Sequence, residues 1–343
     1  MLLSLCTNII GLISDYSNEK KYQLLNKEIN KEVKIVESSN YWKNKYSKYL
    51  IDIKLNEIEL KGNYIWKYEF IRITNFDNWE ILKNNKTKEI GNLINLQQLY
   101  LNNSKITVTP IVLSPSLRCL PKEIGNLTNL RQLHLSNNLI EKIPKEIGNL
   151  YNLEELYLNN NKIKEIPEEI GNLVKLNWLD LHKNKIKKIP QELCNLKKLK
   201  YLDLQKNKIK KIPVEISNLE KIKYLDLQKN KIIKIPEELG NLKKLEELNL
   251  FNNRIKEIPK EIGNLTNLQL LYLDNNLIEK IPKKIMNLIN LKELYLNNNL
   301  IEKIPKEIIY LNNLQKLYFH KNRIKEIPKE IGDFLNNLRD FWY

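Results

Sequence analysis

The amino-acid sequence predicts an α/β solenoid, a stacked array in which short strands alternate with helical turns. One observation is a fixed period, because an Asn recurs nine times at intervals of 23 residues. Another is that ten of the 12 prolines occupy one position of the same repeat. A period of roughly 20 to 50 residues is typical of stacked repeats, in which neighbouring units bury one another's apolar faces. The recurring residues are Asn138, Asn161, Asn184, Asn207, Asn230, Asn253, Asn276, Asn299 and Asn322.

A plain copy of the repeat is the segment 130–151, LRQLHLSNNLIEKIPKEIGNLY. Leucines at its fourth and sixth positions alternate with polar or aromatic neighbours, which predicts a half-buried strand. The Asn at the ninth position then turns the chain away from the strand. Seven positions are apolar, more than one unit can bury alone, so units are expected to stack on both sides. The seven residues are Leu130, Leu133, Leu135, Ile140, Ile143, Ile147 and Leu150.

The repeated proline predicts where a helical turn begins. Proline suits the first turn of a helix, where its missing N–H is no loss. The following x-Glu-Ile-Gly-Asn-Leu is therefore expected to form one short helical turn on the convex side. Other residues replace its Gly in four repeats, so a positive φ is not expected at this position. The replacements are Cys194, Ser217, Met286 and Ile309.

Residues 1–87 lack the repeat and are expected to form an N-terminal segment of their own. Apolar residues at helical spacing predict an amphipathic helix over residues 18–36. Alternating residues in 51–55 and 64–70, on either side of a Lys-Gly-Asn turn, predict an aromatic hairpin. A solenoid needs its first apolar layer covered, so the segment is expected to be a cap. An independent binding domain is the alternative.

The repeat domain is expected to span residues 88–343. Its first unit is interrupted by an apolar insertion at 107–119, and such insertions usually emerge as a loop from one face. This loop either folds back onto the cap or contacts a partner. The chain ends half-way through a further unit, in which Phe341 and Tyr343 take inward positions. Those aromatics either close the last layer or mark a truncation.

The repeat, with its Ile-Pro-x-Glu-Ile-Gly-Asn-Leu stretch, resembles the 23-residue class of the leucine-rich repeat family. This class occurs in intracellular signalling scaffolds of the Ras-pathway type and in many bacterial proteins. The resemblance covers residues 88–343. It implies a horseshoe with a parallel β-sheet on the concave face, short helical turns on the convex face, and a ladder of Asn side chains. For function it implies protein binding on the concave face.

Composition narrows the class of protein further. The chain has 343 residues, of which 42% are hydrophobic and 29% charged, so it is expected to be soluble and able to bury a core. Its three cysteines are widely spaced, which argues against a disulfide framework or a zinc site. No basic residue precedes the short apolar run at the N-terminus, and no stretch reaches the roughly 18 apolar residues of a membrane span. A cytoplasmic location is predicted.

The sequence contains no recognisable catalytic or cofactor-binding motif. The sequence has no Gly-rich phosphate loop, no Gly-x-Ser-x-Gly elbow and no paired Cys motif. His134, His182 and His320 lie at outward positions of separate repeats, without a Ser or Cys nearby in the sequence to activate. The interpretation is a non-enzymatic protein without a catalytic residue, cofactor or metal.

The positions that vary within the repeat carry the functional hypothesis. In three central repeats an aromatic residue at the third position stands beside an Asp at the fifth, both facing out of the concave sheet. Exposed aromatics next to charge are typical of binding hot spots, although they also stabilise strands through cross-strand pairs. The Asp column is expected to be neutralised by neighbouring lysines rather than by a cation. The predicted contacts of a monomer with a protein partner are Trp178, Asp180, Tyr201, Asp203, Tyr224, Asp226, Phe251 and Tyr272.

An alternative function follows from the formal charge of +16. Lysines gather on one edge of the same central repeats, and such an edge suits nucleic acid or an acidic membrane surface. Charge runs are usually a solvated face, however, and the neighbouring Asp column would repel a polyanion. The lysines are Lys183, Lys185, Lys187, Lys188, Lys206, Lys208, Lys210, Lys211, Lys229, Lys231 and Lys234.

Overall fold

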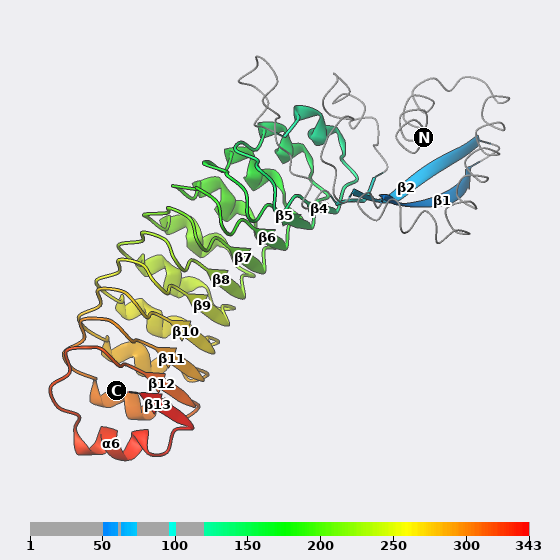
Figure 1. Cartoon of the computed structure of the whole chain (residues 1–343). Helices are drawn as coiled ribbons and strands as arrows, with labels where there is room; N and C mark the ends of the chain where they lie inside the picture. The colour runs from blue at the N-terminus through cyan, green and yellow to red at the C-terminus, as the bar shows by residue number, and fades with distance from the viewer. Residues whose placement is uncertain (1–50, 61–62, 74–95, 101–119, 343) are drawn as a thin grey trace, which may run out of the picture.

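The computed structural model describes residues 51–60, 63–73, 96–100 and 120–342. In these ranges 13 strands form one sheet in chain order (Figure 1). Strands β1 (Ile51–Leu60) and β2 (Asn63–Ile73) pair antiparallel, in agreement with the predicted hairpin. Its role as a cap stays a prediction. The predicted helix at 18–36 and the insertion at 107–119 lie outside the described residues.

From β2 onward every strand pair is parallel, and each repeat contributes one strand of three residues to the concave face. Pairing is in register, so equivalent repeat positions form columns across the sheet; Asp203, for example, pairs with both Asp180 and Asp226. The strands are β3 (Gln98–Tyr100), β4 (Gln132–His134), β5 (Glu155–Tyr157), β6 (Trp178–Asp180), β7 (Tyr201–Asp203), β8 (Tyr224–Asp226), β9 (Glu247–Asn249), β10 (Leu270–Tyr272), β11 (Glu293–Tyr295), β12 (Lys316–Tyr318) and β13 (Asp340–Trp342).

A short 3-10 helix, set back from the sheet, follows each strand from β3 to β11, and an α-helix takes its place after β12 (Figure 1). The repeated proline is the N-cap residue rather than part of the first helical turn. Pro190 is extended, with ψ 144°, and its carbonyl accepts a hydrogen bond of 3.2 Å from Leu193 N. The helices are η1 (Lys122–Asn126), η2 (Lys145–Asn149), η3 (Glu168–Asn172), η4 (Gln191–Asn195), η5 (Val214–Asn218), η6 (Glu237–Asn241), η7 (Lys260–Asn264), η8 (Lys283–Asn287), η9 (Lys306–Tyr310) and α6 (Lys329–Leu335).

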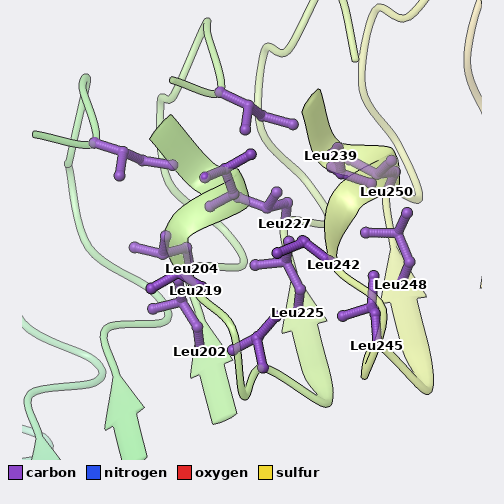
Figure 2. Packing of buried hydrophobic residues seen from close by; sticks show 14 of the residues in the cluster. Leu202, Leu204, Leu219, Leu225, Leu227, Leu239, Leu242, Leu245, Leu248 and Leu250 are labelled. Atoms are coloured by element: carbon purple, nitrogen blue, oxygen red, sulfur yellow. The ribbon is translucent and has the colours of Figure 1, made fainter. Parts of the chain in front are cut away.

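The apolar positions form one continuous core between the sheet and the helical turns. All seven apolar residues of the repeat that begins at Leu130 are at most 3% exposed. Figure 2 shows Leu202 and Leu225 of neighbouring strands packing against Leu219 and Leu242, which follow the helical turns. Within the described residues, no helix is long or apolar enough to span a bilayer.

The Asn ladder forms as the resemblance implies. Asn207 Nδ2 donates hydrogen bonds of 3.0 Å to the carbonyls of Leu181 and Leu204, in two successive repeats. Its Oδ1 accepts a bond of 3.0 Å from Ile186 N. Both ends of the amide are therefore used, and Asn207 is only 7% exposed. The ladder satisfies backbone groups that would otherwise be buried without a partner.

Glycine in the helical turn serves close approach rather than a positive φ. A Cβ at Gly171 would lie only 2.4 Å from the carbonyl oxygen of Glu192 in the next repeat. The left-handed residue of each regular repeat is instead the one before the ladder Asn, with φ between 52° and 58°. Asn is enriched in this conformation, but lysine occupies it in several repeats. The left-handed residues are Asn137, Asn160, Lys183, Lys206, Lys229, Asn252, Asn275, Asn298 and Lys321.

Candidate functional site

The aromatic residues of the three central repeats form a continuous stack on the concave face. The ring centroids of Trp178 and Tyr201 are 3.6 Å apart with the planes inclined by 7°. Tyr201 and Tyr224 follow at 4.4 Å and 3°. All three side chains are half-buried. With the column of Asp180, Asp203 and Asp226 beside them, these six residues are called the central strip.

The Asp column of the central strip is buried, whereas the sequence suggested an exposed column. Asp180, Asp203 and Asp226 are 9%, 3% and 1% exposed, respectively. The residue two positions after each Asp supplies the principal donors. Gln205 donates to Asp203 from its backbone N at 2.9 Å and from Nε2 at 3.0 Å. The carboxylates therefore lie beneath the surface of the concave face, and the half-buried aromatic rings are the more accessible part of the central strip.

The three carboxylates differ in how completely they are satisfied. Asp226 accepts bonds from the backbone and side chain of Gln228, from Tyr224 OH at 3.1 Å and from Asn249 Nδ2 at 3.2 Å. Asp180 accepts only from His182, at 3.1 Å from the backbone N and 2.8 Å from Nδ1, among the residues that the structure describes. Hydrogen bonding to the column therefore weakens from β8 to β6.

Neutralisation of the column by lysines was expected and is wrong. In the described part of the chain no lysine forms an ion pair with these carboxylates, and the partner is His182, whose Nδ1 is 2.8 Å from Asp180 and 3.6 Å from Asp203. Lys183 and Lys206 lie three residues beyond the Asp, in the left-handed turn after the strand. Neither lysine forms an ion pair with the column in the described structure.

Burial dominates the electrostatics of the central strip. It raises the pKa of Asp203 to about 6, with the charges of Asp226 and Asp180 adding to the effect against the hydrogen bonds from Gln205. Burial likewise raises the pKa of Asp226. The hydrogen bond that His182 donates to Asp180, and then the charges of Asp180 and Asp203, raise the pKa of His182 against burial. The central strip therefore contains three carboxylates, and His182 is the cationic partner that faces two of them, Asp180 and Asp203, in the described structure.

Two of the predicted contact residues fall outside the central strip. Phe251 lies beyond the next strand, β9, and Lys229 Nζ is 5.7 Å from its ring centroid, over the ring face. Tyr272 stacks on Tyr295 at 4.7 Å, and Tyr295 on Tyr318 at 4.8 Å. These three tyrosines, with Glu293 and Lys316 between them, are called the C-terminal strip. The predicted site therefore divides into two aromatic stacks and a bordering Phe.

Some features of the site were missed at the level of sequence. The indole N–H of Trp178 is buried and has no hydrogen-bond partner in the described structure. The sequence showed the lysines after the strands only as a charged edge and did not reveal their left-handed backbone conformation. The grouping of His182 with two carboxylates also went unrecognised, although His182 stands where the next repeats have Gln205 and Gln228. That exchange of Gln for His was the available signal.

A shallow groove of about 370 Å³ lies beside the strand beginnings of β6 and β7. Its lysines are on the opposite edge from the lysine edge predicted from the sequence, because they precede the strands. Lys175 Nζ is held by Asn152 Oδ1 at 2.8 Å. The groove is lined by Glu154, Lys175, Asn177, Lys198, Lys200 and Lys221.

On the convex side, Cys194 has the packing role that its position predicts. It is fully buried, and burial raises the pKa of its thiol to about 12. A thiol in this state is a poor nucleophile and a poor metal ligand.

Comparison with protein families agrees with the repeat architecture. A model described as a leucine-rich repeat region matches residues 113–177, 145–221, 168–254 and 214–298. A second leucine-rich repeat model matches residues 289–341. The chain belongs to the leucine-rich repeat family. Its repeats form a fold that is commonly a protein-interaction module and typically lacks enzymatic activity.

Solved structures show the same solenoid. A leucine-rich repeat protein of Leptospira interrogans is 36% identical, with a TM-score of 0.56 and 74% of each chain covered. An internalin from Listeria monocytogenes is 25% identical, with a TM-score of 0.59 over 75% of this chain and 76% of that one. A plant peptide hormone receptor, solved with its peptide, is 33% identical with a TM-score of 0.63; 74% of this chain matches 40% of the receptor. No curated protein matches the chain.

Proposed function

We propose that this leucine-rich repeat chain is a non-enzymatic recognition module that binds a protein or peptide through its central strip. The observation that carries the proposal is a concentration of unfavourable features in three repeats whose scaffold is otherwise regular. Deviations from local structural rules without a gain in stability are expected at functional sites.

Three different features contribute. Among the described residues these buried carboxylates have no lysine or arginine partner, which opposes folding, and Asp203 and Asp226 are the most buried of them. The buried indole N–H of Trp178 has no hydrogen-bond partner in the described part of the chain, which costs roughly 1–3 kcal/mol. Lysine takes the left-handed position in all three of these repeats, at Lys183, Lys206 and Lys229, and elsewhere in the described chain only at Lys321. None of these features is needed by the Asn ladder or the leucine core.

The aromatic stack supplies the contact surface. Large rings that are stacked on one another lose little further side-chain freedom when a partner covers them, and Trp and Tyr are enriched in binding hot spots. The plant receptor among the related structures is described in complex with a peptide hormone. A ligand lying across β6, β7 and β8 would cover Trp178, Tyr201 and Tyr224 together. Intracellular signalling is a further part of the proposal and rests on the resemblance to Ras-pathway scaffolds alone.

The test compares two matched triple variants in affinity capture with mass spectrometry of the bound proteins. One is Trp178→Ala, Tyr201→Ala, Tyr224→Ala; the other is Tyr272→Ala, Tyr295→Ala, Tyr318→Ala. Each removes one aromatic stack and leaves the ladder intact, and circular dichroism checks that both remain folded. We expect the first variant to bind the partner at least about tenfold more weakly, which corresponds to a loss of about 1.4 kcal/mol or more of binding free energy.

Retention of the partner by the central variant and its loss by the C-terminal variant would place the site on the C-terminal strip instead. Anion binding is the second candidate, and the groove lined by four lysines favours it. Repeating the capture at about 50 and 200 mM salt separates the two, because phosphate contacts weaken steeply over that range. A partner that resists salt and depends on Trp178, Tyr201 and Tyr224 supports the protein-binding proposal.

A further inference from the structure

We infer that Asp180, His182 and Asp203 form a binding site for a divalent transition metal ion, with Zn²⁺ as the ion that the donors fit best. One ligand atom from each residue lies within 4.8 Å of the other two. The side chains come from β6, from the residue that follows its end by two positions, and from β7. The site shares Asp180 and Asp203 with the central strip, but its test measures metal binding by the chain alone and therefore does not depend on the proposed protein partner.

The spacing of the donor atoms suits a small cation. His182 Nδ1 is 2.8 Å from Asp180 Oδ1 and 3.6 Å from Asp203 Oδ2. A tetrahedral Zn²⁺ bound at about 2.0–2.2 Å keeps its ligand atoms roughly 3.5 Å apart. A modest opening between His182 and Asp180 would therefore admit the ion. Three protein ligands leave a fourth position for water.

The type of donor selects the metal. Two carboxylates alone would suit Ca²⁺ or Mg²⁺, which prefer oxygen ligands and usually need more of them. The imidazole nitrogen shifts the preference toward Zn²⁺ and related transition metals. The ion would replace the proton on His182 Nδ1 that faces Asp180: the imidazolium would release this proton to solvent and keep the one on Nε2, so that a neutral imidazole binds the metal.

The neighbouring carboxylate shows why the site is at this end of the column. Asp226 is occupied by donors from Gln228, Tyr224 and Asn249, so its lone pairs are already used. Asp180 has donors from His182 only, in the described structure. Buried charges are usually paired or bound to metal, and the single imidazole of His182 cannot balance this column.

Gln205 has a role beside the ligands. Its backbone N donates to Asp203 Oδ1 at 2.9 Å, and its Nε2 donates to Oδ2 at 3.0 Å. Hydrogen bonds of this kind hold a ligating carboxylate in one orientation and are a regular part of metal sites. The pair fixes Asp203 toward His182 without consuming every lone pair of Oδ2.

The repeat itself provides the variants for the test. His182→Gln introduces the residue that the next two repeats carry at this position, so the fold is expected to tolerate it. His320 occupies the same repeat position far along the array, beside Tyr318 rather than an Asp, and His320→Gln is the matched control. Asp203→Asn removes one ligand charge and preserves the shape of the side chain.

The experiment is calorimetric titration of ZnCl₂ into the full chain, free of any affinity tag and pretreated with chelator. We expect His182→Gln and Asp203→Asn to weaken one Zn²⁺ site by at least about tenfold, while His320→Gln binds like the wild type. Visible absorption of Co²⁺ in the same proteins should show a tetrahedral signature that His182→Gln abolishes. Equal Zn²⁺ binding by wild type and His182→Gln would overturn the proposal, even if zinc binds elsewhere on the chain.

Discussion

The central strip and the C-terminal strip occupy the same sheet and the same repeat, yet their aromatic and charged columns are exchanged. The aromatics stand at the third repeat position in β6 to β8 and at the fifth in β10 to β12, with Glu247 and Asn249 of β9 at the crossover. Both columns stack their rings at similar distances, from 3.6 to 4.8 Å. Stacking is therefore available at either position, and it does not explain the exchange.

The strips differ in how their carboxylates are compensated. Glu293 of the C-terminal strip is 2.9 Å from Lys316 Nζ and accepts a hydrogen bond of 2.6 Å from Tyr295 OH. Partial burial opposes ionisation, but the bonds from Tyr295 and Lys316 together lower its pKa. In the central strip burial raises the pKa of Asp203 instead. Glu293 is therefore compensated by its neighbours, whereas the burial of Asp203 is not compensated by a lysine or arginine among the described residues.

The largest predicted effect tests whether the two regions share one scaffold. Asn207→Leu beneath the central strip and Asn299→Leu beneath the C-terminal strip each remove an amide that bridges two carbonyls and one backbone N–H. We expect each to lower the free energy of unfolding by roughly 3 kcal/mol or more, because three buried backbone groups lose their partner. Chemical denaturation measures it, with the exposed Lys208→Ala as control.

If the effects of Asn207→Leu and Asn299→Leu on the free energy of unfolding differ by more than about 1 kcal/mol, the regions differ in scaffold as well as in surface.

The ladder is also the part of the structure that the sequence predicted best. A strict 23-residue period with one Asn leaves few ways to place that side chain, and the leucine columns fix its register.

The surface was predictable only in part. Alternation along the strand placed Trp178 and Asp180 on the concave side, but it could not give the burial of Asp180, because that depends on the side chains of neighbouring repeats. The left-handed conformation of Lys183 was equally hidden, since lysine has little preference for it. The expected pairing of lysine with the Asp column does not form among the described residues, where His182 is the partner instead.

An effect of intermediate size compares the carboxylates directly. Asp203→Asn is expected to stabilise the chain at pH 7.5 by about 2 kcal/mol, because a folded-state pKa of about 6 makes the ionised carboxylate unfavourable. Glu293→Gln should destabilise it at the same pH, by about 0.5–1 kcal/mol, because this pKa is lowered. Thermal unfolding in the presence of a chelator measures both and keeps any metal out.

The pH dependence of stability tests independently whether each variant stabilises or destabilises the chain. A raised pKa contributes stability below its unfolded value, near 4, and loses it as pH rises through about 6, so the advantage of Asp203→Asn should vanish at pH 3.5. A lowered pKa contributes stability above its unfolded value and loses it on acidification, so the defect of Glu293→Gln should also shrink at pH 3.5. Two variants that shift stability in the same direction at pH 7.5 would contradict the contrast between the strips.

The smallest effect concerns the left-handed residue after the strand. Lys206, beside the central strip, has φ 52°, and Asn275, beside the C-terminal strip, has φ 55°. Their backbone N–H groups make equivalent bonds of 2.9 Å to the next repeat, to Gln228 O and Asn297 O. Only the side chain differs. Since Asn is enriched several-fold in this conformation, Lys206→Asn should stabilise by roughly 0.5–1 kcal/mol and Asn275→Lys should destabilise by a similar amount.

Precise thermal unfolding detects such changes, which correspond to shifts of about 1–3 °C in Tm for an array of this size. Stabilisation by Lys206→Asn would mean that lysine stands beside the central strip although Asn suits the turn better. Affinity capture with the same variant would then show whether the partner needs the lysine charge. Destabilisation would instead mean that Lys206 compensates the Asp column at long range, although no ion pair joins them. In that case the central strip would be closer to the C-terminal strip than its contacts suggest, and the argument from uncompensated charge would be lost.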